Sequence, residues 1–211
     1  MIIDNKKFDV PTTERARSYM RQQRVRFHLR TPSEGNLPQC TKPGRKKNKL
    51  NTGAQASVCA GISNGKIVLW EYLPKKWNGE TAAATYKGPI MQALTKARGV
   101  KRSYKVVEDN DPTGYKSNKA KVAKRELGIN AMPMPTYSPD LNPLDFSLWD
   151  AIEERMLANT PEHVETVAAY KKRMRLTAFR LPSSRVTSAV RSIPKRMRAV
   201  VKAKGYSIPR D

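Results

Sequence analysis

The first half of the chain alternates short apolar runs with polar segments, a pattern typical of strands. Ile2 and Ile3 predict a buried strand that begins almost at the first residue. Apolar runs at 56–63 and 66–73 flank the dipeptide Asn64-Gly65. Because this dipeptide readily adopts the positive φ angles of a tight turn, the two runs are predicted to form a β-hairpin.

Farther along the chain, helical and extended patterns alternate. Residues 81–98 carry apolar side chains at helical spacing, and Pro89 is expected to bend that helix. A compact strand at 104–109, a basic helix at 116–127 and a second short strand at 129–135 follow. This order indicates a βαβ unit within a mixed α and β fold.

After the βαβ unit the signals change to those of helices. Asn142 can cap a helix, Pro143 fits its first position, and Asp145 falls at the third. The same logic predicts another helix that begins at Thr160. A late amphipathic stretch over 186–201, interrupted at Pro194, has a basic opposite face: Arg185, Arg191, Lys195, Arg196, Arg198, Lys202 and Lys204.

The net charge adds a class of partner to this picture. The 211 residues include 41 Lys plus Arg and 18 Asp plus Glu, a formal charge of +23. Such an excess indicates a polyanionic partner, and nucleic acid is favoured over a membrane because the chain has no long apolar run. Two basic regions are expected to contact DNA phosphates. They are an exposed loop over 31–52, through Arg45, Lys46, Lys47 and Lys49, and the late helix, through Arg191, Lys195, Arg196 and Arg198.

Two further features concern the cellular compartment. Cys40 and Cys59 have neither paired spacing nor a nearby histidine, so they are expected to be reduced thiols rather than a zinc site. The start of the chain lacks the charged and apolar regions of a secretory signal. An intracellular protein is therefore predicted, nuclear if the source is eukaryotic.

Three acidic residues occupy positions where a fold holds side chains rigidly. Asp4 lies on the first strand, Asp109 at the end of the 104–109 strand, and Asp145 in a first helical turn. Two-metal phosphoryl transfer needs carboxylates that converge on two ions about 4 Å apart. The pattern alone is not specific, because the helix dipole and helix caps also favour acidic residues at such places.

Neighbouring acidic residues compete for the same role. Strand alternation sets Glu108 on the opposite face from Asp109. Asp140 and Asp111 are each expected to close a turn through a side-chain to backbone hydrogen bond. Trp70 and Trp149 are predicted to lie in the core rather than to stack on bases.

The three aspartates lie in three distinctive sequence blocks. These are Asp4-Asn5-Lys6-Lys7-Phe8, Glu108-Asp109-Asn110-Asp111-Pro112, and Ser138-Pro139-Asp140-Leu141-Asn142-Pro143-Leu144-Asp145 followed by Leu148-Trp149. They resemble blocks of the mariner-like transposase superfamily, which is of the three-carboxylate type. In that family the third block ends in the third metal ligand and the second block carries the second ligand, and the match to the first block is the shortest. The resemblance assigns catalysis and metal binding to Asp4, Asp109 and Asp145.

The resemblance also carries expectations for the whole chain. It implies a ribonuclease-H-like fold, with a central mixed sheet flanked by helices and a helical C-terminal extension. Residues 1–160 would form the catalytic core and 161–211 a basic helical extension of the same domain. Two Mg²⁺ or Mn²⁺ ions would be the cofactors, with no small-molecule cofactor. DNA would be the partner, a homodimer would pair two DNA ends, and the activity would be cut-and-paste transposition.

The chain departs from the family pattern at several points. Between Asp109 and Asp145 lie 35 residues, one more than is usual, and the last ligand is Asp where many members have Glu. Thr113-Gly114-Tyr115 stands where the family often has a histidine, and the chain begins at its first strand, without the family's helix-turn-helix modules. Two alternatives therefore stay open: a transposase remnant or domesticated core that binds nucleic acid without cutting it, and a basic structural protein of a ribonucleoprotein particle.

Overall fold

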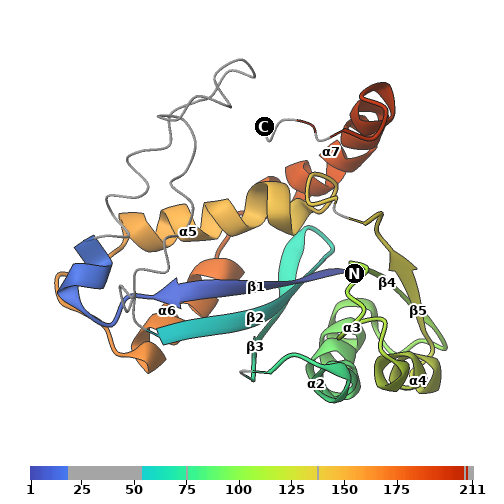
Figure 1. Cartoon of the computed structure of the whole chain (residues 1–211), viewed down its shortest axis with the longest axis horizontal. Coiled ribbons are helices and arrows are strands. Elements are labelled where there is room, and N and C mark those ends of the chain that lie inside the picture. The colour runs from blue at the N-terminus through green and yellow to red at the C-terminus, as the bar shows by residue number, and fades with distance from the viewer. Residues whose placement is uncertain (19–53, 75, 137, 207, 209–211) are drawn as a thin grey trace.

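A five-stranded mixed sheet forms the centre of the computed structural model, which describes residues 1–18, 54–74, 76–136, 138–206 and 208 (Figure 1). The strands are β1 (Ile2–Val10), β2 (Ala54–Ser63), β3 (Lys66–Leu73), β4 (Tyr104–Glu108) and β5 (Ile129–Pro133). They lie in the order β3-β2-β1-β4-β5. The first predicted strand is therefore the central one.

The pairing of the strands confirms both predicted supersecondary units. β2 and β3 are antiparallel neighbours, and the turn between them has the positive φ angles expected of Asn64 (52°) and Gly65 (69°). β4 and β5 are parallel neighbours, joined by α4 (Asn118–Glu126) as a βαβ unit. β1 pairs antiparallel with β2 and parallel with β4, which makes the sheet mixed.

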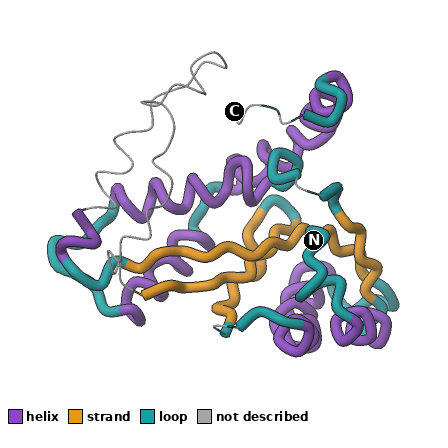
Figure 2. Tube along the Cα trace, viewed as in Figure 1, coloured by secondary structure: helices purple, strands orange, loops and turns teal. Residues whose placement is uncertain are grey.

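Helices cover both faces of the sheet (Figures 1 and 2). On one face lie α2 (Gly79–Thr85), the π-helical segment η1 (Tyr86–Ile90), α3 (Met91–Arg98) and α4. On the other lie the π-helical segment η2 (Leu144–Leu148), α5 (Trp149–Ala158), α6 (Val167–Phe179) and the first turns of α7 (Ser183–Lys202). The rest of α7 projects away from the sheet (Figure 1).

Alternation along β1 separates two hydrophobic cores. Ile3 packs with α2, α3 and α4, whereas Phe8 packs with α5 and α6. Trp70 and Trp149 are buried in the second core with their rings tilted at 66° and 5.8 Å between centroids, as predicted for core residues. Since side chains two residues apart share a face, Asp4 lies on the same side as Phe8. The site is thus built against the tryptophan side of the sheet.

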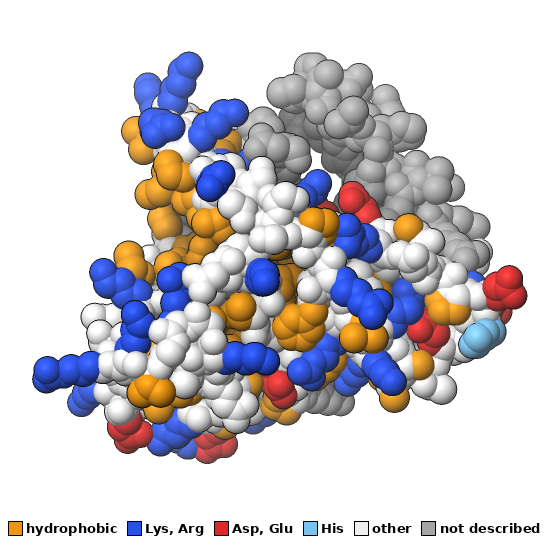
Figure 3. Space-filling view, turned by 180° about the vertical axis from the view of Figure 1, so that it is seen from behind, with side chains coloured by type: hydrophobic (Ala, Val, Ile, Leu, Met, Phe, Trp, Pro, Cys, Tyr) orange, Lys and Arg blue, Asp and Glu red, His pale blue; other side chains and the backbone are white. Residues whose placement is uncertain are grey.

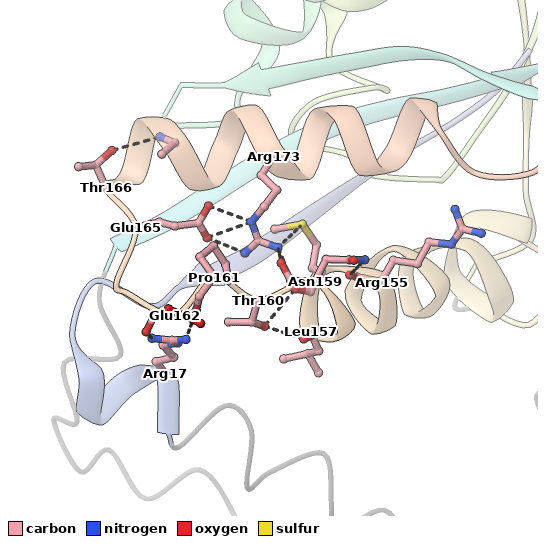
Figure 4. A network of polar contacts seen from close by, with 12 residues as sticks. Arg17, Arg155, Leu157, Asn159, Thr160, Pro161, Glu162, Glu165, Thr166 and Arg173 are labelled. Carbon is pink, nitrogen blue, oxygen red and sulfur yellow. Dashed lines mark hydrogen bonds and ion pairs between the residues drawn. The ribbon is translucent and has the colours of Figure 1, made fainter.

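The predicted helix start at Thr160 is wrong. α6 begins at Val167 instead, and the Thr166 hydroxyl caps it by accepting from the Ala169 N–H at 3.2 Å. The intervening loop is held by Arg17, whose guanidinium donates to the carbonyl oxygens of Pro161 and Glu162 (Figure 4). Because Arg17 binds the carbonyl oxygens of Pro161 and Glu162, these residues are stabilised as a loop rather than as the first turn of a helix.

Two prolines affect their helices differently. The bend expected at Pro89 takes the form of η1, which accommodates the missing N–H between α2 and α3. The interruption predicted at Pro194 is wrong, because α7 continues through that residue. None of the described helices is both long and apolar enough to cross a membrane.

Candidate active site

Asp4 is fixed on the central strand by an indole. The Trp149 Nε1–H donates to Asp4 Oδ2 at 2.9 Å, and Asp4 is only 6% exposed. Trp149 is itself held in the core, edge to face against Phe8 at 5.6 Å between ring centroids. The indole is therefore a rigid donor that holds this carboxylate in one orientation.

Asp109 follows the last residue of β4. Ile2 of β1 pairs with Val107 of the parallel strand β4. The same register, continued by two residues on both strands, sets Asp4 beside Asp109. The Asp111 N–H donates to Asp109 Oδ1 at 3.2 Å, which fixes the second carboxylate at the strand end.

Asp145 lies in the first turn of η2, the helical segment that follows β5 and a connecting loop. Asn142 Oδ1 accepts from the Leu144 N–H at 3.1 Å, so Asn142 caps this turn as predicted. The Asn142 amide also donates to Asp145 Oδ2 at 3.2 Å. The turn is π-helical, a feature that the sequence pattern did not predict. Asn142 thus joins the start of the helix to the orientation of the third carboxylate.

The three aspartates line one cavity of about 310 Å³. Its described lining contains neither Lys nor Arg. Asn110, Asp111, Ser138 and Asn142 lie in the same sequence blocks as Asp109 and Asp145, whereas no signal in the sequence indicated that Met134 and Thr136, which follow β5, would line the cavity. The other residues that line the cavity are Asn110, Asp111, Pro112, Met134, Pro135, Thr136, Ser138, Pro139 and Asn142.

Burial makes two of these carboxylates weaker acids. The pKa of Asp4 is raised to about 7, first because burial disfavours the charged form and second because the Asp145 charge lies nearby; the Trp149 hydrogen bond opposes this rise. The pKa of Asp109 is also raised, mainly by burial. Two carboxyls whose charged forms are both disfavoured form a site that a cation would stabilise.

The donor chemistry of the cavity fits a hard divalent cation. Mg²⁺ and Mn²⁺ prefer carboxylate and carbonyl oxygens, which Asp4, Asp109, Asp145 and the Asn142 amide supply. Within the described part of the chain, no three acidic, His or Cys side chains are gathered closely enough to hold one ion. The fit therefore lies in the kind of donors and their shared location, not in a finished coordination geometry.

The raised pKa of Asp4 predicts a pH dependence of stability. The unfolded chain loses this proton near the ordinary pKa of 3.8, whereas the folded chain keeps it to about 7. As the pH rises from about 3.8 to about 7 in metal-free buffer, the free energy of unfolding of the wild type should therefore fall by up to about 4 kcal/mol relative to that of Asp4→Asn. Above about pH 7 the difference should level off. Urea denaturation of both proteins at several pH values measures this difference, and a difference that does not change with pH would contradict the prediction.

The competing acidic residues have other roles in the structure. Glu108 points to the opposite face, as predicted, and forms an ion pair with Lys124 at 2.5 Å. Asp111 closes its turn, as predicted, by accepting from two backbone N–H groups of the loop that follows it. The carboxylate of Asp140 accepts from the Ile208 N–H at 3.1 Å, and the closure of its own turn stays a prediction.

The basic face of α7 is only partly as predicted. Arg191, Lys195 and Arg198 are exposed. Arg196, in contrast, is 3% exposed; its Nε–H donates to the Asp140 carbonyl oxygen at 2.6 Å, and its guanidinium lies 4.2 Å from the centre of the Phe146 ring. A side chain buried in this way cannot reach DNA, so the predicted DNA contact of Arg196 is wrong. The amphipathic pattern could not show this, because it does not reveal which loop covers a side chain. The basic residues expected in the loop over 31–52 lie outside the described residues: Arg45, Lys46, Lys47 and Lys49.

Two curated proteins of Caenorhabditis briggsae are similar to this chain in sequence. The Tcb1 transposable-element transposase is 33% identical over 107 residues, 50% of this chain and 37% of that protein. The Tcb2 transposable-element transposase is 29% identical over 112 residues, 51% of this chain and 37% of that protein. The matches thus span just over a third of each relative's length. No protein-family model matches the chain.

Solved structures of Mos1 transposase share the fold. A structure of its catalytic domain with raltegravir and Mn matches with a TM-score of 0.64 and 17% identity, over 74% of this chain and 78% of that one. A paired-end complex with the left transposon end matches with a TM-score of 0.69 and 16% identity, over 99% of this chain and 56% of that one. The resemblance to mariner-like transposases is therefore confirmed: about half of the chain is similar in sequence to these transposases, and the chain shares the ribonuclease-H-like fold of the Mos1 catalytic domain.

Proposed function

We propose that this chain is the catalytic domain of a transposase that binds DNA, cleaves phosphodiester bonds and transfers the cut strand. One observation carries the proposal: Asp4, Asp109 and Asp145, from three separate elements, line one cavity whose described lining has no basic side chain. Structures of Mos1 transposase with Mn and with Mg support a divalent metal as cofactor. The proposed ligands are these three aspartates, with Asp4 between two ions.

Bound metal would stabilise negative charge on the attacking and leaving oxygens of the phosphate. The protein's own contribution is orientation. Trp149 holds Asp4 and Asn142 holds Asp145, so neither carboxylate has to be ordered when the substrate arrives. The Asp4 carboxyl group has a pKa of about 7, and loss of its proton prepares the carboxylate to bind a cation.

DNA would be held by phosphate contacts. The exposed side chains of Arg191, Lys195 and Arg198 on α7 support this role, and the face seen in Figure 3 carries many Lys and Arg side chains. We retain the proposal of a core over 1–160 with a basic extension over 161–211. We also propose a homodimer that pairs two DNA ends and acts inside the cell, in the nucleus of a eukaryotic source; the Mos1 paired-end complexes support the dimer.

Cleavage of supercoiled plasmid tests the proposal. The purified chain, alone and joined to a helix-turn-helix module, should convert the plasmid to nicked product with Mn²⁺ and should leave it intact with a chelator. Plasmid binding is measured in the same reactions by gel shift. Binding without any metal-dependent cleavage in either protein would contradict the enzyme proposal and favour a nucleic-acid-binding relic.

A further inference from the structure

A second hollow lies beside the candidate active site, between α4 and the edge strand β5. It is an open groove of about 540 Å³. Its charged lining consists of four cations, Lys116, Lys121, Lys124 and Arg125, and one anion, Glu108. The basic helix predicted over 116–127 forms one wall of this groove as α4, and no DNA contact was predicted for it.

Three of the four cations are available to a ligand. Lys124 is buried and paired with Glu108, so these two charges neutralise each other. Lys116, Lys121 and Arg125 are exposed, and none forms an ion pair with another described residue. Other basic side chains nearby are engaged, as in the pair of Lys119 with Glu80 and that of Lys87 with Glu126. The groove therefore keeps a positive charge that the described part of the chain does not compensate.

The groove and the catalytic cavity meet at the ends of the same two strands. Glu108 lines the groove and Asp109 lines the cavity. On β5, Pro133 lines the groove, and the next residue, Met134, lines the cavity. A chain of phosphates that leaves the cavity around the edge of the sheet would therefore enter the groove.

We propose that this groove binds the phosphate backbone of duplex DNA that leads away from the catalytic cavity. Lys121 and Arg125 are one helical turn apart, about 6 Å along α4, so the cations form a track rather than a pocket for one small anion. Lys and Arg side chains are donors only and suit phosphate oxygens, and Ser103 and Asn130 add neutral donors to the lining. The inference rests on the proposed DNA-binding function and adds the route of the DNA.

Matched charge removal tests the groove. The variant Lys116→Gln/Lys121→Gln removes two exposed groove cations. The control Lys66→Gln/Lys96→Gln removes two exposed lysines of the β2–β3 hairpin and α3, which do not line the groove. Binding of a labelled duplex of arbitrary sequence is followed by fluorescence anisotropy between about 50 and 200 mM salt. Circular dichroism confirms that both variants fold.

The salt dependence gives the sharpest readout. Each lost phosphate contact should reduce the slope of log Kobs against log salt by about 0.9, so the groove variant should lose about 1.8 and bind at least about tenfold more weakly at low salt. The control should keep most of the wild-type slope. Equal losses in both variants would overturn the proposal, because they would reflect net charge alone.

Two further outcomes separate this inference from the function on which it rests. If the groove variant binds duplex as the wild type does but loses binding to poly-glutamate, the groove binds an acidic protein and the proposal is wrong. If the wild-type chain cleaves plasmid and the groove variant keeps the full salt slope, the proposed function stands and only the groove fails. If the wild-type chain does not bind duplex at all, both fail.

Discussion

Replacement of Asp109 with Asn should abolish metal-dependent nicking of plasmid while leaving the affinity for duplex DNA unchanged. The carboxamide keeps the size of the side chain and can still accept from the Asp111 N–H. It removes the negative charge that would hold the cation. Loss of several kcal/mol of metal-based stabilisation of the transition state corresponds to a decrease in rate of at least about a thousandfold. Initial rates of nicking with Mn²⁺ measure the effect.

The matched control for this variant is Asp9→Asn. Asp9 lies on the same strand as Asp4 but outside the cavity, where it accepts from the Gln55 side chain at 3.0 Å. Its replacement should change neither nicking nor binding. Nicking that survives in Asp109→Asn, or that falls equally in both variants, would remove Asp109 from the proposed ligand set.

Local patterns predicted the elements whose causes are local. The hairpin at Asn64-Gly65 follows from the backbone freedom of two residues, and the βαβ unit follows from the order of apolar runs. The Asn142 cap likewise depends on a residue only two positions away. Such features need no knowledge of the rest of the chain.

Two of the predictions that were wrong, those for the Thr160 helix start and for Arg196, depended on partners distant in sequence. The loop at Pro161 and Glu162 is held by Arg17, 145 positions before the second of them. Arg196 is buried because the Asp140 carbonyl, 56 positions away, accepts from it. An amphipathic pattern shows which side chains are charged, but it does not show which part of the chain covers them.

The candidate site combines both cases. The sequence placed Asp109 at the end of a strand and Asp145 at the start of a helix. Their approach to Asp4 depends on the folded chain, in which β1 pairs with β4 and the three residues line one cavity. The indole that orients Asp4 was predicted only as a core residue. A signal was present, since Trp149 lies four residues after Asp145 on the same helical face.

Replacement of Lys124 with Met should destabilise the domain by about 3 to 5 kcal/mol. Lys124 Nζ donates to Glu108 Oε1 at 2.5 Å and to the Tyr115 carbonyl oxygen at 2.9 Å, and both side chains of the pair are almost fully buried. Methionine leaves the Glu108 carboxylate in the core, where the Tyr86 hydroxyl is its remaining donor among the described residues. Urea denaturation at neutral pH measures the loss in the free energy of unfolding.

A double replacement separates the cost of an unpaired charge from that of lost packing. Glu108→Gln/Lys124→Met removes both charges and keeps similar volumes, so it should recover most of the stability that Lys124→Met loses. Lys119→Met, which breaks an exposed pair with Glu80 beside the same helix, should change stability little. A double variant as unstable as Lys124→Met would show that the lysine acts through its packing. Because Glu108 precedes Asp109, recovery of stability with weakened Mn²⁺ binding would further indicate that the ion pair positions Asp109, the proposed second metal ligand.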